Sequence, residues 1–243
     1  MLSPTNNLKK WFYLFAMTGL FFTACSKNNN PTPTPDPTPD PPVQTGSVPF
    51  YKLQRVENLF APADDSNPAA VLPSIYYSLE NKGEVSVDFV KTASWDMNFS
   101  GTYNIYIGSN GATDHKTEGG ILILKQPFEQ VTDVPTDDQF TTTKTFGLDA
   151  DGAFGQGTGW ALYDFDGTKM GDGSAQKHHV VYALPATRTL VVRTAKGNYA
   201  KIKMISCYKD AFTADKWFID TPHMYFTFEY VIVPKGSKKF EIK

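Results

Sequence analysis

Cysteine is scarce in this chain of 243 residues, which contains only Cys25 and Cys207. This scarcity excludes a disulfide scaffold and a zinc site built from cysteines. Cys207 lies in residues 201–208, where apolar and polar residues alternate as in a strand. We therefore expect Cys207 to be a small buried hydrophobic residue. Cys25 has a different setting, close to the start of the chain.

The chain also lacks a strong charge of one sign. It has 23 basic and 25 acidic residues, and the net charge is −2. The basic residues do not cluster, which argues against nucleic acid as a partner. No internal period of the length seen in solenoids and propellers is found, so a repeat protein is not expected.

Known catalytic motifs are absent as well. The sequence has no G-x-S-x-G elbow, no H-E-x-x-H motif, no P-loop and no dinucleotide fingerprint. Only four histidines are present, and no local pattern selects a serine to pair with one of them. Residues 148–152 and 163–167 each hold two aspartates, but a calcium loop needs more oxygen ligands and a closing glutamate. We expect turns at these aspartates and a binding protein rather than an enzyme.

Helical periodicity is nearly absent, and residues 208–212 and 215–218 are the best short helical candidates. Tyr, Phe, Val, Thr and Ile recur instead with the two-residue period of a strand. This pattern predicts strands in residues 83–90, 102–107, 120–124, 188–194, 199–204 and 224–233. Gly197 between two of these strands predicts a hairpin. We expect an all-β fold, an antiparallel sandwich or open barrel with few or no helices.

The N-terminal residues have the pattern of a lipoprotein signal. Lys9 and Lys10 precede an apolar run over residues 11–22, and a small residue comes directly before Cys25. The run is short for a transmembrane anchor, and nothing amphipathic follows it that would suggest a core helix. We expect residues 1–24 to be a signal peptide and Cys25 to carry the lipid, palmitate included. More than one acyl chain would hold the protein stably on a membrane.

Proline alternates with threonine or aspartate over residues 31–42. Proline fixes φ and removes a backbone donor, so neither helix nor sheet can form there. The segment is predicted to be a semi-rigid spacer or a disordered one, and both would hold a domain away from the membrane. We expect a tether over residues 25–45 and a single β domain over residues 46–243, which is long enough for a sizeable core.

Several motifs of the domain follow one another in the order of a known family. They are W-D-M at residues 95–97, V-P-T-D at 134–137, G-W at 159–160 and V-R-T-A-K-G-N-Y-A-K at 192–201. This succession resembles the HmuY-like haem-binding lipoproteins of the Bacteroidetes, with a weak match before residue 78. The resemblance implies anchoring at the outer membrane, on the cell surface or facing the periplasm. It also implies capture of haem (iron protoporphyrin IX), free or from a haem-carrying protein, and delivery to an outer-membrane haem transporter.

The resemblance also indicates where axial ligands of the haem iron would lie. In such proteins one ligand comes from the loop between V-P-T-D and G-W, and the other from the segment between G-W and the V-R-T-A hairpin. Residues 135–160 contain neither histidine nor methionine. The second segment contains His178, His179 and Met170, which are the candidate axial ligands.

The surroundings of these candidates follow from strand geometry. If His178 and His179 lie on a strand, only one of them can face a porphyrin. Val180 and Val181 would then flank the pair. Aromatic residues would pack against an exposed haem edge, and the candidates are Trp160, Tyr163 and Phe165.

A second interpretation of the histidines stays open. The pair at 178 and 179 could be a surface turn without a role, in a β-sheet module that binds a protein or glycan and has lost haem ligation. The other two histidines are not predicted to be ligands. His115 lies in a polar segment and is expected to be solvated, and His223 is expected in a turn before the last strand.

Overall fold

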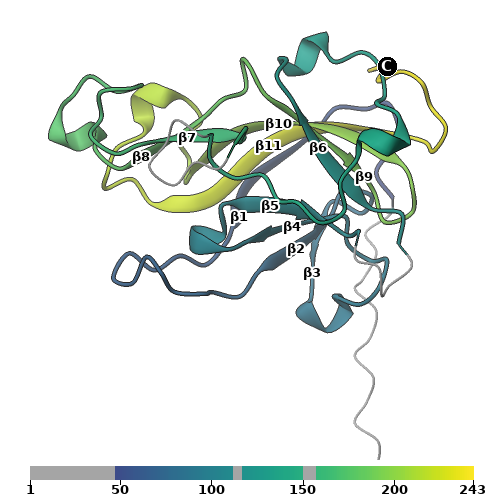
Figure 1. Cartoon of the computed structure of the whole chain (residues 1–243), viewed down its shortest axis with the longest axis horizontal. Helices are drawn as coiled ribbons and strands as arrows, with labels where there is room; N and C mark the ends of the chain where they lie inside the picture. The colour runs from purple at the N-terminus through teal and green to yellow at the C-terminus, as the bar shows by residue number, and fades with distance from the viewer. Residues whose placement is uncertain (1–46, 112–116, 150–156) are drawn as a thin grey trace, which may run out of the picture. The chain divides into compact units, whose positions relative to one another are not determined.

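The structure, a computed structural model, describes residues 47–111, 117–149 and 157–243 (Figure 1). Two compact units are distinguished, Met1–Thr38 and Pro39–Lys243, and all described residues belong to the second. The predicted signal peptide (residues 1–24), the predicted tether with Cys25 (residues 25–45), His115 and residues 150–152 of one predicted turn lie outside the described residues. Across the described ranges, no helix has the length and apolar character needed to cross a membrane.

The described residues confirm the all-β prediction, because every helical segment among them is a single 3-10 turn. The strands are β1 (Gln54–Phe60), β2 (Ile75–Ser78), β3 (Gly83–Val85), β4 (Met97–Ser100), β5 (Tyr106–Ser109), β6 (Gly120–Leu124), β7 (Ala161–Asp164), β8 (Val180–Ala183), β9 (Thr189–Arg193), β10 (Tyr199–Tyr208) and β11 (His223–Val233). The 3-10 turns are η1 (Val87–Phe89), η2 (Thr102–Asn104), η3 (Phe128–Gln130), η4 (Asp137–Gln139), η5 (Ala175–Lys177) and η6 (Ala214–Lys216).

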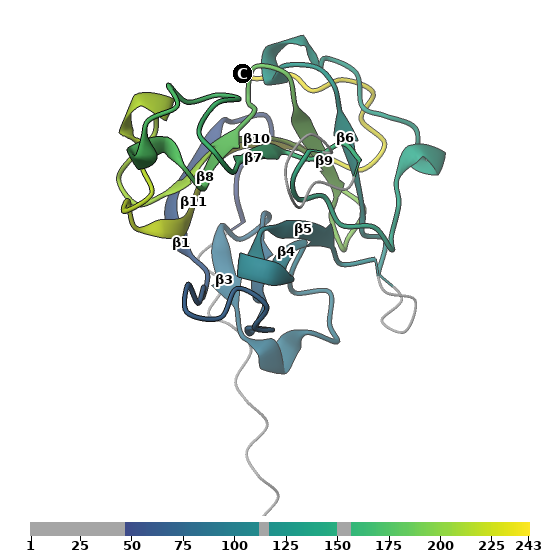
Figure 2. The ribbon, with the colours of Figure 1, turned by 60° about the vertical axis from the view of Figure 1, so that its left-hand side comes forward.

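The strands form antiparallel sheets that face each other (Figure 2). The larger sheet has the order β1-β11-β10-β9-β6, the smaller has the order β3-β2-β4-β5, and β7 pairs with β8 in a separate ribbon. The strands β10 and β11 are the longest described, with 10 and 11 residues. They run within the larger sheet from beside β9 to the β7–β8 ribbon (Figure 1).

Aromatic side chains join the two sheets in the core. Phe99 of β4 stacks on Phe226 of β11 with ring centroids 4.3 Å apart, and Tyr77 of β2 meets Phe228 of β11 edge-on at 5.6 Å. These rings are almost completely buried, so each contributes both apolar burial and a specific ring geometry. The sandwich predicted from the alternating pattern is therefore closed by aromatic residues on facing strands.

Several predicted elements are confirmed in detail. The strands β9 and β10 form the predicted hairpin, and Gly197 in its turn has a φ of 87°, which favours glycine. The strand β11 corresponds to the predicted last strand. Cys207 is a free thiol that is only 1 % exposed, as its position in a strand predicted.

Other predicted elements are wrong. The predicted strand at residues 83–90 ends at Val85, because Ser86 Oγ accepts a hydrogen bond from the Asp88 N–H and begins η1. The predicted strand at 102–107 begins with η2, where Tyr103 has a φ of 54°. Residues 208–212 form no helix, and the second helical candidate is only the short turn η6.

Candidate functional site

The β7–β8 ribbon carries the three ligand candidates predicted from the sequence. Asp164 at the end of β7 pairs with Val180 at the start of β8. The connection between them, residues 165–179, contains Met170, His178 and His179. The backbone N–H of Val181 donates to Tyr208 Oη at 2.8 Å, which fixes the ribbon to β10. The candidates are thus presented by one long connection on a supported ribbon.

A buried carboxylate shapes this connection. Asp164 Oδ2 accepts hydrogen bonds from the backbone N–H groups of Lys169, Met170 and Gly171 at 3.1, 2.8 and 3.1 Å. Burial works against the charge, but these donors outweigh it and hold the pKa of Asp164 below its ordinary value. Asp164 was expected in a turn, but it is the last residue of β7, and its carboxylate binds the backbone of the connection that follows. As a consequence, the backbone of Met170 is held in place from inside the ribbon.

His179 is fixed at both its backbone and its ring. Its φ is 58°, which is uncommon for a residue other than glycine, and its N–H donates to the Phe165 carbonyl at 3.2 Å. The ring Nδ1 lies 2.6 Å from Tyr163 Oη, within a hydrogen bond. The Phe165 ring meets the imidazole edge-on with centroids 4.7 Å apart. We call Tyr163, Phe165 and His179 the ribbon cluster.

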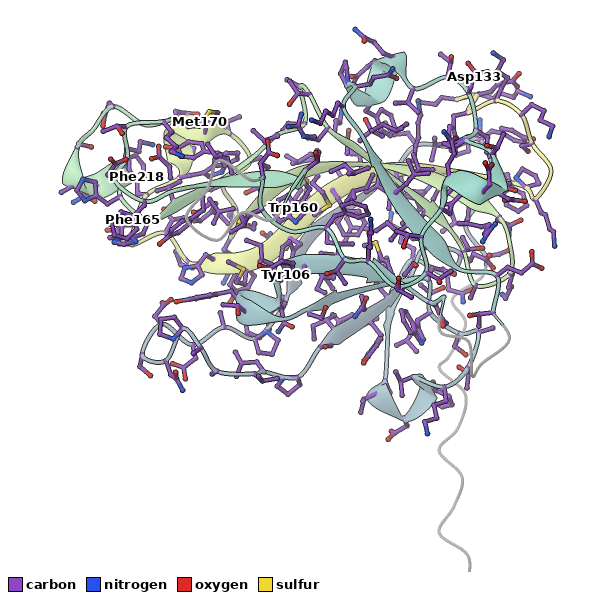
Figure 3. The ribbon with its side chains drawn as sticks, viewed as in Figure 1. Tyr106, Asp133, Trp160, Phe165, Met170 and Phe218 are labelled. Atoms are coloured by element: carbon purple, nitrogen blue, oxygen red, sulfur yellow. The ribbon has the colours of Figure 1, made fainter. Side chains whose placement is uncertain are left out.

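The ribbon cluster lies at the surface. His179 is exposed, Tyr163 is half-buried, and Phe165 is 57 % exposed. Phe165, Met170 and Phe218 gather at the end of the molecule that lies opposite Asp133 (Figure 3). An apolar ring, a phenol and an imidazole are therefore presented together to a ligand.

The other two ligand candidates have different settings. His178 is half-buried and ends η5, where its N–H donates to the Ala175 carbonyl at 3.3 Å. Met170 is 49 % exposed on the same connection. Both histidines lie in a turn before β8 rather than on a strand, so the expected strand alternation does not apply to them. Iron ligation by His178, His179 or Met170 stays a prediction.

The expected surroundings need one correction. Trp160, predicted to pack against an exposed haem edge, is 1 % exposed, and its Nε1 donates to the Ile105 carbonyl at 2.9 Å. Val180 and Val181 are likewise buried in the core. Of the aromatic residues predicted to contact haem, Tyr163 and Phe165 remain accessible to a ligand. The sequence does not distinguish a core tryptophan from a surface one in so aromatic a chain.

His223, Asp65 and Tyr103 form a further group of polar and aromatic side chains. His223 begins β11 rather than preceding it, and its Nε2 lies 3.1 Å from Asp65 Oδ1. The His223 ring is 5.9 Å from the ring of Tyr103. Burial, Asp65 and the phenol of Tyr163 raise the pKa of Tyr103, so the two tyrosines lie within electrostatic reach of each other. The sequence carries no signal for this group, because Asp65 and His223 are 158 residues apart.

Among the described residues, the ribbon cluster is not part of a site for a bare metal ion. In residues 47–111, 117–149 and 157–243, no three His, Cys, Asp or Glu side chains are grouped to hold a metal ion. Haem differs from a bare ion, because the porphyrin supplies the equatorial ligands and the protein needs only an axial one. An exposed phenol–imidazole pair beside an apolar ring fits that requirement. A groove of about 280 Å³ lies elsewhere, lined by residues such as Tyr76, Asn98 and Lys144.

Comparison with known protein families shows to which family this all-β chain belongs. The family model described as HmuY protein matches residues 73–230. This match spans more than half of the chain, and the chain therefore belongs to the HmuY family. The membership confirms the resemblance that the succession of motifs indicated.

Two solved structures are similar to this chain at low sequence identity. A Bacteroides fragilis protein described as a lipoprotein is 14 % identical, with 76 % of this chain and 92 % of that chain covered and a TM-score of 0.37. The apo form of a Tannerella forsythia HmuY analog is 12 % identical, with 77 % of this chain and 100 % of that chain covered and a TM-score of 0.36. Comparison with curated proteins finds no match.

Proposed function

We propose that this chain is a membrane-anchored haem-binding protein that captures haem and passes it to an outer-membrane uptake system. Membership of the HmuY family supports a haem-related function. The observation that carries the proposal is the ribbon cluster, where an exposed imidazole is held by a phenol at 2.6 Å beside an exposed phenyl ring. Haem needs both an axial ligand and apolar surface, and the ribbon cluster offers both.

The ribbon cluster suits the two parts of the haem molecule. Tyr163 or His179 would supply a ligand to the haem iron, and both side chains are oriented by the ribbon. The porphyrin face packs against Phe165, and apolar contact contributes about 25 cal/mol for each Å² removed from water. Met170 and His178 lie on the same connection and are the candidates for the opposite axial position.

The proposed cellular setting rests on the sequence. Lipid on Cys25 would anchor the chain at the outer membrane, and the proline-rich residues 31–42 would let the domain reach beyond the membrane surface. From this position the domain would take haem, free or from a haem-carrying protein, and release it to a transporter. An exposed rather than enclosed site suits release, because haem then leaves without the domain opening.

Haemin titration of the full chain in detergent tests the proposal. A shifted Soret band that saturates at one haem per chain is the expected result, in the ferric or the ferrous state. The variants His179→Ala, His178→Ala and Met170→Ala are titrated in parallel, with His115→Ala as the matched histidine control. No Soret shift for the unaltered chain in either redox state would overturn the proposal.

The second candidate function is a surface module that binds a glycan or a protein without haem. One observation favours it, namely the groove of about 280 Å³ that combines the aromatic Tyr76 with the polar side chains of Asn98 and Lys144. Aromatic faces with polar neighbours suit sugar recognition. Binding of a glycan by the full chain, abolished in Tyr76→Ala and unaffected in His179→Ala, would support this alternative.

A further inference from the structure

We propose that Tyr163 ligates the ferric iron of haem through Oη, and that His179 is its hydrogen-bond partner and accepts its proton. This inference rests on the proposed haem binding and names the ligand atom of that site. It reverses the roles expected from the sequence, where His179 was the candidate ligand and Tyr163 only a neighbour of the porphyrin.

The geometry of the pair is that of a preformed acid–base couple. Tyr163 Oη and His179 Nδ1 are 2.6 Å apart, at the short end of the range for hydrogen bonds. Tyr163 is held by the ladder of β7 and β8, opposite Val181. His179 is held by its bond to the Phe165 carbonyl and by a φ of 58°, a backbone conformation that persists only where the surroundings impose it. The contact therefore does not depend on two freely rotating side chains.

The couple provides a balanced ligand exchange. In the free protein the phenolic proton of Tyr163 lies in the hydrogen bond to His179, whose Nδ1 is 2.6 Å from Oη. When ferric haem binds, Tyr163 would lose the Oη–H proton and supply its oxygen as a ligand to the iron, and the water or hydroxide that the iron carries in solution would leave. The proton moves to His179 Nδ1, whose N–H then donates back to the phenolate oxygen. No electron is transferred, and no other reactant is needed.

The alternative assignment places the proton differently. If His179 Nε2 ligated the iron, Nδ1 would keep its hydrogen and donate to a neutral Tyr163. A phenolate is a hard, negatively charged ligand, which favours ferric over ferrous iron, whereas an imidazole accommodates both. The two assignments therefore differ in redox preference as well as in spectrum. That difference makes the inference testable without any measurement of haem transfer.

The experiment compares Tyr163→Phe and His179→Gln with the unaltered full chain in detergent, loaded with ferric and then ferrous haem. Tyr163→Phe removes only the ligand oxygen, and the matched control Tyr225→Phe alters a half-buried tyrosine of β11 that contacts Phe60. We expect tyrosinate–iron resonance Raman bands in the unaltered chain and in Tyr225→Phe, but none in Tyr163→Phe. Ferric affinity should fall about tenfold or more in Tyr163→Phe, with little change in ferrous affinity.

The variant His179→Gln tests whether His179 is the iron ligand or the hydrogen-bond partner of Tyr163. His179→Gln should keep the tyrosinate bands at a shifted frequency, with weaker ferric binding. Loss of all axial ligation in His179→Gln, with an unchanged spectrum in Tyr163→Phe, would overturn the inference in favour of a histidine ligand. Unchanged spectra in both variants would show that the pair is only structural. Absence of any Soret shift in the unaltered chain would instead refute the proposed function, and circular dichroism checks that each variant is folded.

Discussion

Asp96 Oδ1 accepts a hydrogen bond from the backbone N–H of Ala195 at 3.1 Å. This bond connects the W-D-M motif before β4 to the V-R-T-A-K-G hairpin of the larger sheet. The other oxygen of Asp96 accepts from the N–H groups of Leu79 and Glu80 at 2.7 and 3.2 Å. Two motifs on which the resemblance to the family was based therefore meet at one buried carboxylate, which joins the two sheets.

The substitution Asp96→Asn should destabilise the domain by about 2 kcal/mol or more. In the variant, an amide NH2 group would replace one of the two carboxylate oxygens that accept hydrogen bonds from backbone N–H groups, so two donors would face each other. Residue 96 is only 2 % exposed, so water cannot replace the lost hydrogen bonds. Denaturant unfolding at neutral pH measures the change. Asp88→Asn is the control, because Asp88 is exposed on η1. Equal midpoints for the two variants would contradict the proposed connection between the sheets.

Stability should also respond to pH through Asp96. Burial and the neighbouring Glu80 raise the pKa of Asp96 from its ordinary value of 3.8 to about 6, against the lowering effect of its backbone donors. The folded state therefore holds this proton more tightly than the unfolded chain. The extra stability that comes from holding this proton is complete below about pH 4 and is lost as pH rises through about 6, by at most about 3 kcal/mol. The hydrogen bonds that the carboxylate accepts from the backbone persist at neutral pH.

The measurement isolates this group from other carboxyl groups. The free energy of unfolding is determined from pH 4 to 7 for the unaltered chain and for Asp96→Asn, and the difference between the two curves is taken. We expect the advantage of the unaltered chain to shrink with rising pH. A difference that stays constant, or grows with pH, would show that the buried carboxyl group titrates at its ordinary pKa or below.

Parts of the fold could be predicted from local pattern because local contacts decide them. The β9–β10 hairpin has alternating strands and a glycine where the turn requires a positive φ. The predicted strand at 83–90 is wrong because its apolar spacing also suits a turn, and Ser86 caps that turn. Alternation alone does not reveal where a polar side chain bonds its own backbone.

The candidate site could be predicted only in part. The position of His179 between two motifs predicts it as a candidate ligand, and the aromatic character of Phe165 and Tyr163 predicts them as contacts of haem. Their geometry depends on a connection of residues 165–179 whose path is set by Asp164 from inside the ribbon. Long-range partners such as Asp65 and His223 leave no trace in the spacing of residues. The sequence therefore indicates which residue types are available but not which of them meet.

Removing the carboxylate of Asp164 should loosen the connection that carries Met170. In Asp164→Ala three backbone donors lose their acceptor, and we expect a loss of about 2 kcal/mol in stability. Hydrogen exchange at the amides of Lys169, Met170 and Gly171 should become faster than elsewhere in the domain. Asp164→Asn is the matched control, because its carbonyl oxygen can still accept these bonds. Unchanged exchange in Asp164→Ala would refute this role.

Phe165 should contribute to haem binding but not to folding. Its ring is 57 % exposed and meets His179 edge-on at 4.7 Å. A bound porphyrin would therefore cover the ring, whereas removing the ring would leave the packing of the core unchanged. We expect Phe165→Ser to weaken haem binding about tenfold and to leave the free energy of unfolding within about 0.5 kcal/mol of the unaltered value. The matched control is Phe60→Ser, because Phe60 is 49 % exposed and lies on β1, with its ring 5.0 Å from that of Tyr225. Haem titration and denaturant unfolding of both variants make the test. Equal haem affinity in the two variants would show that haem, if bound, does not use the ribbon cluster.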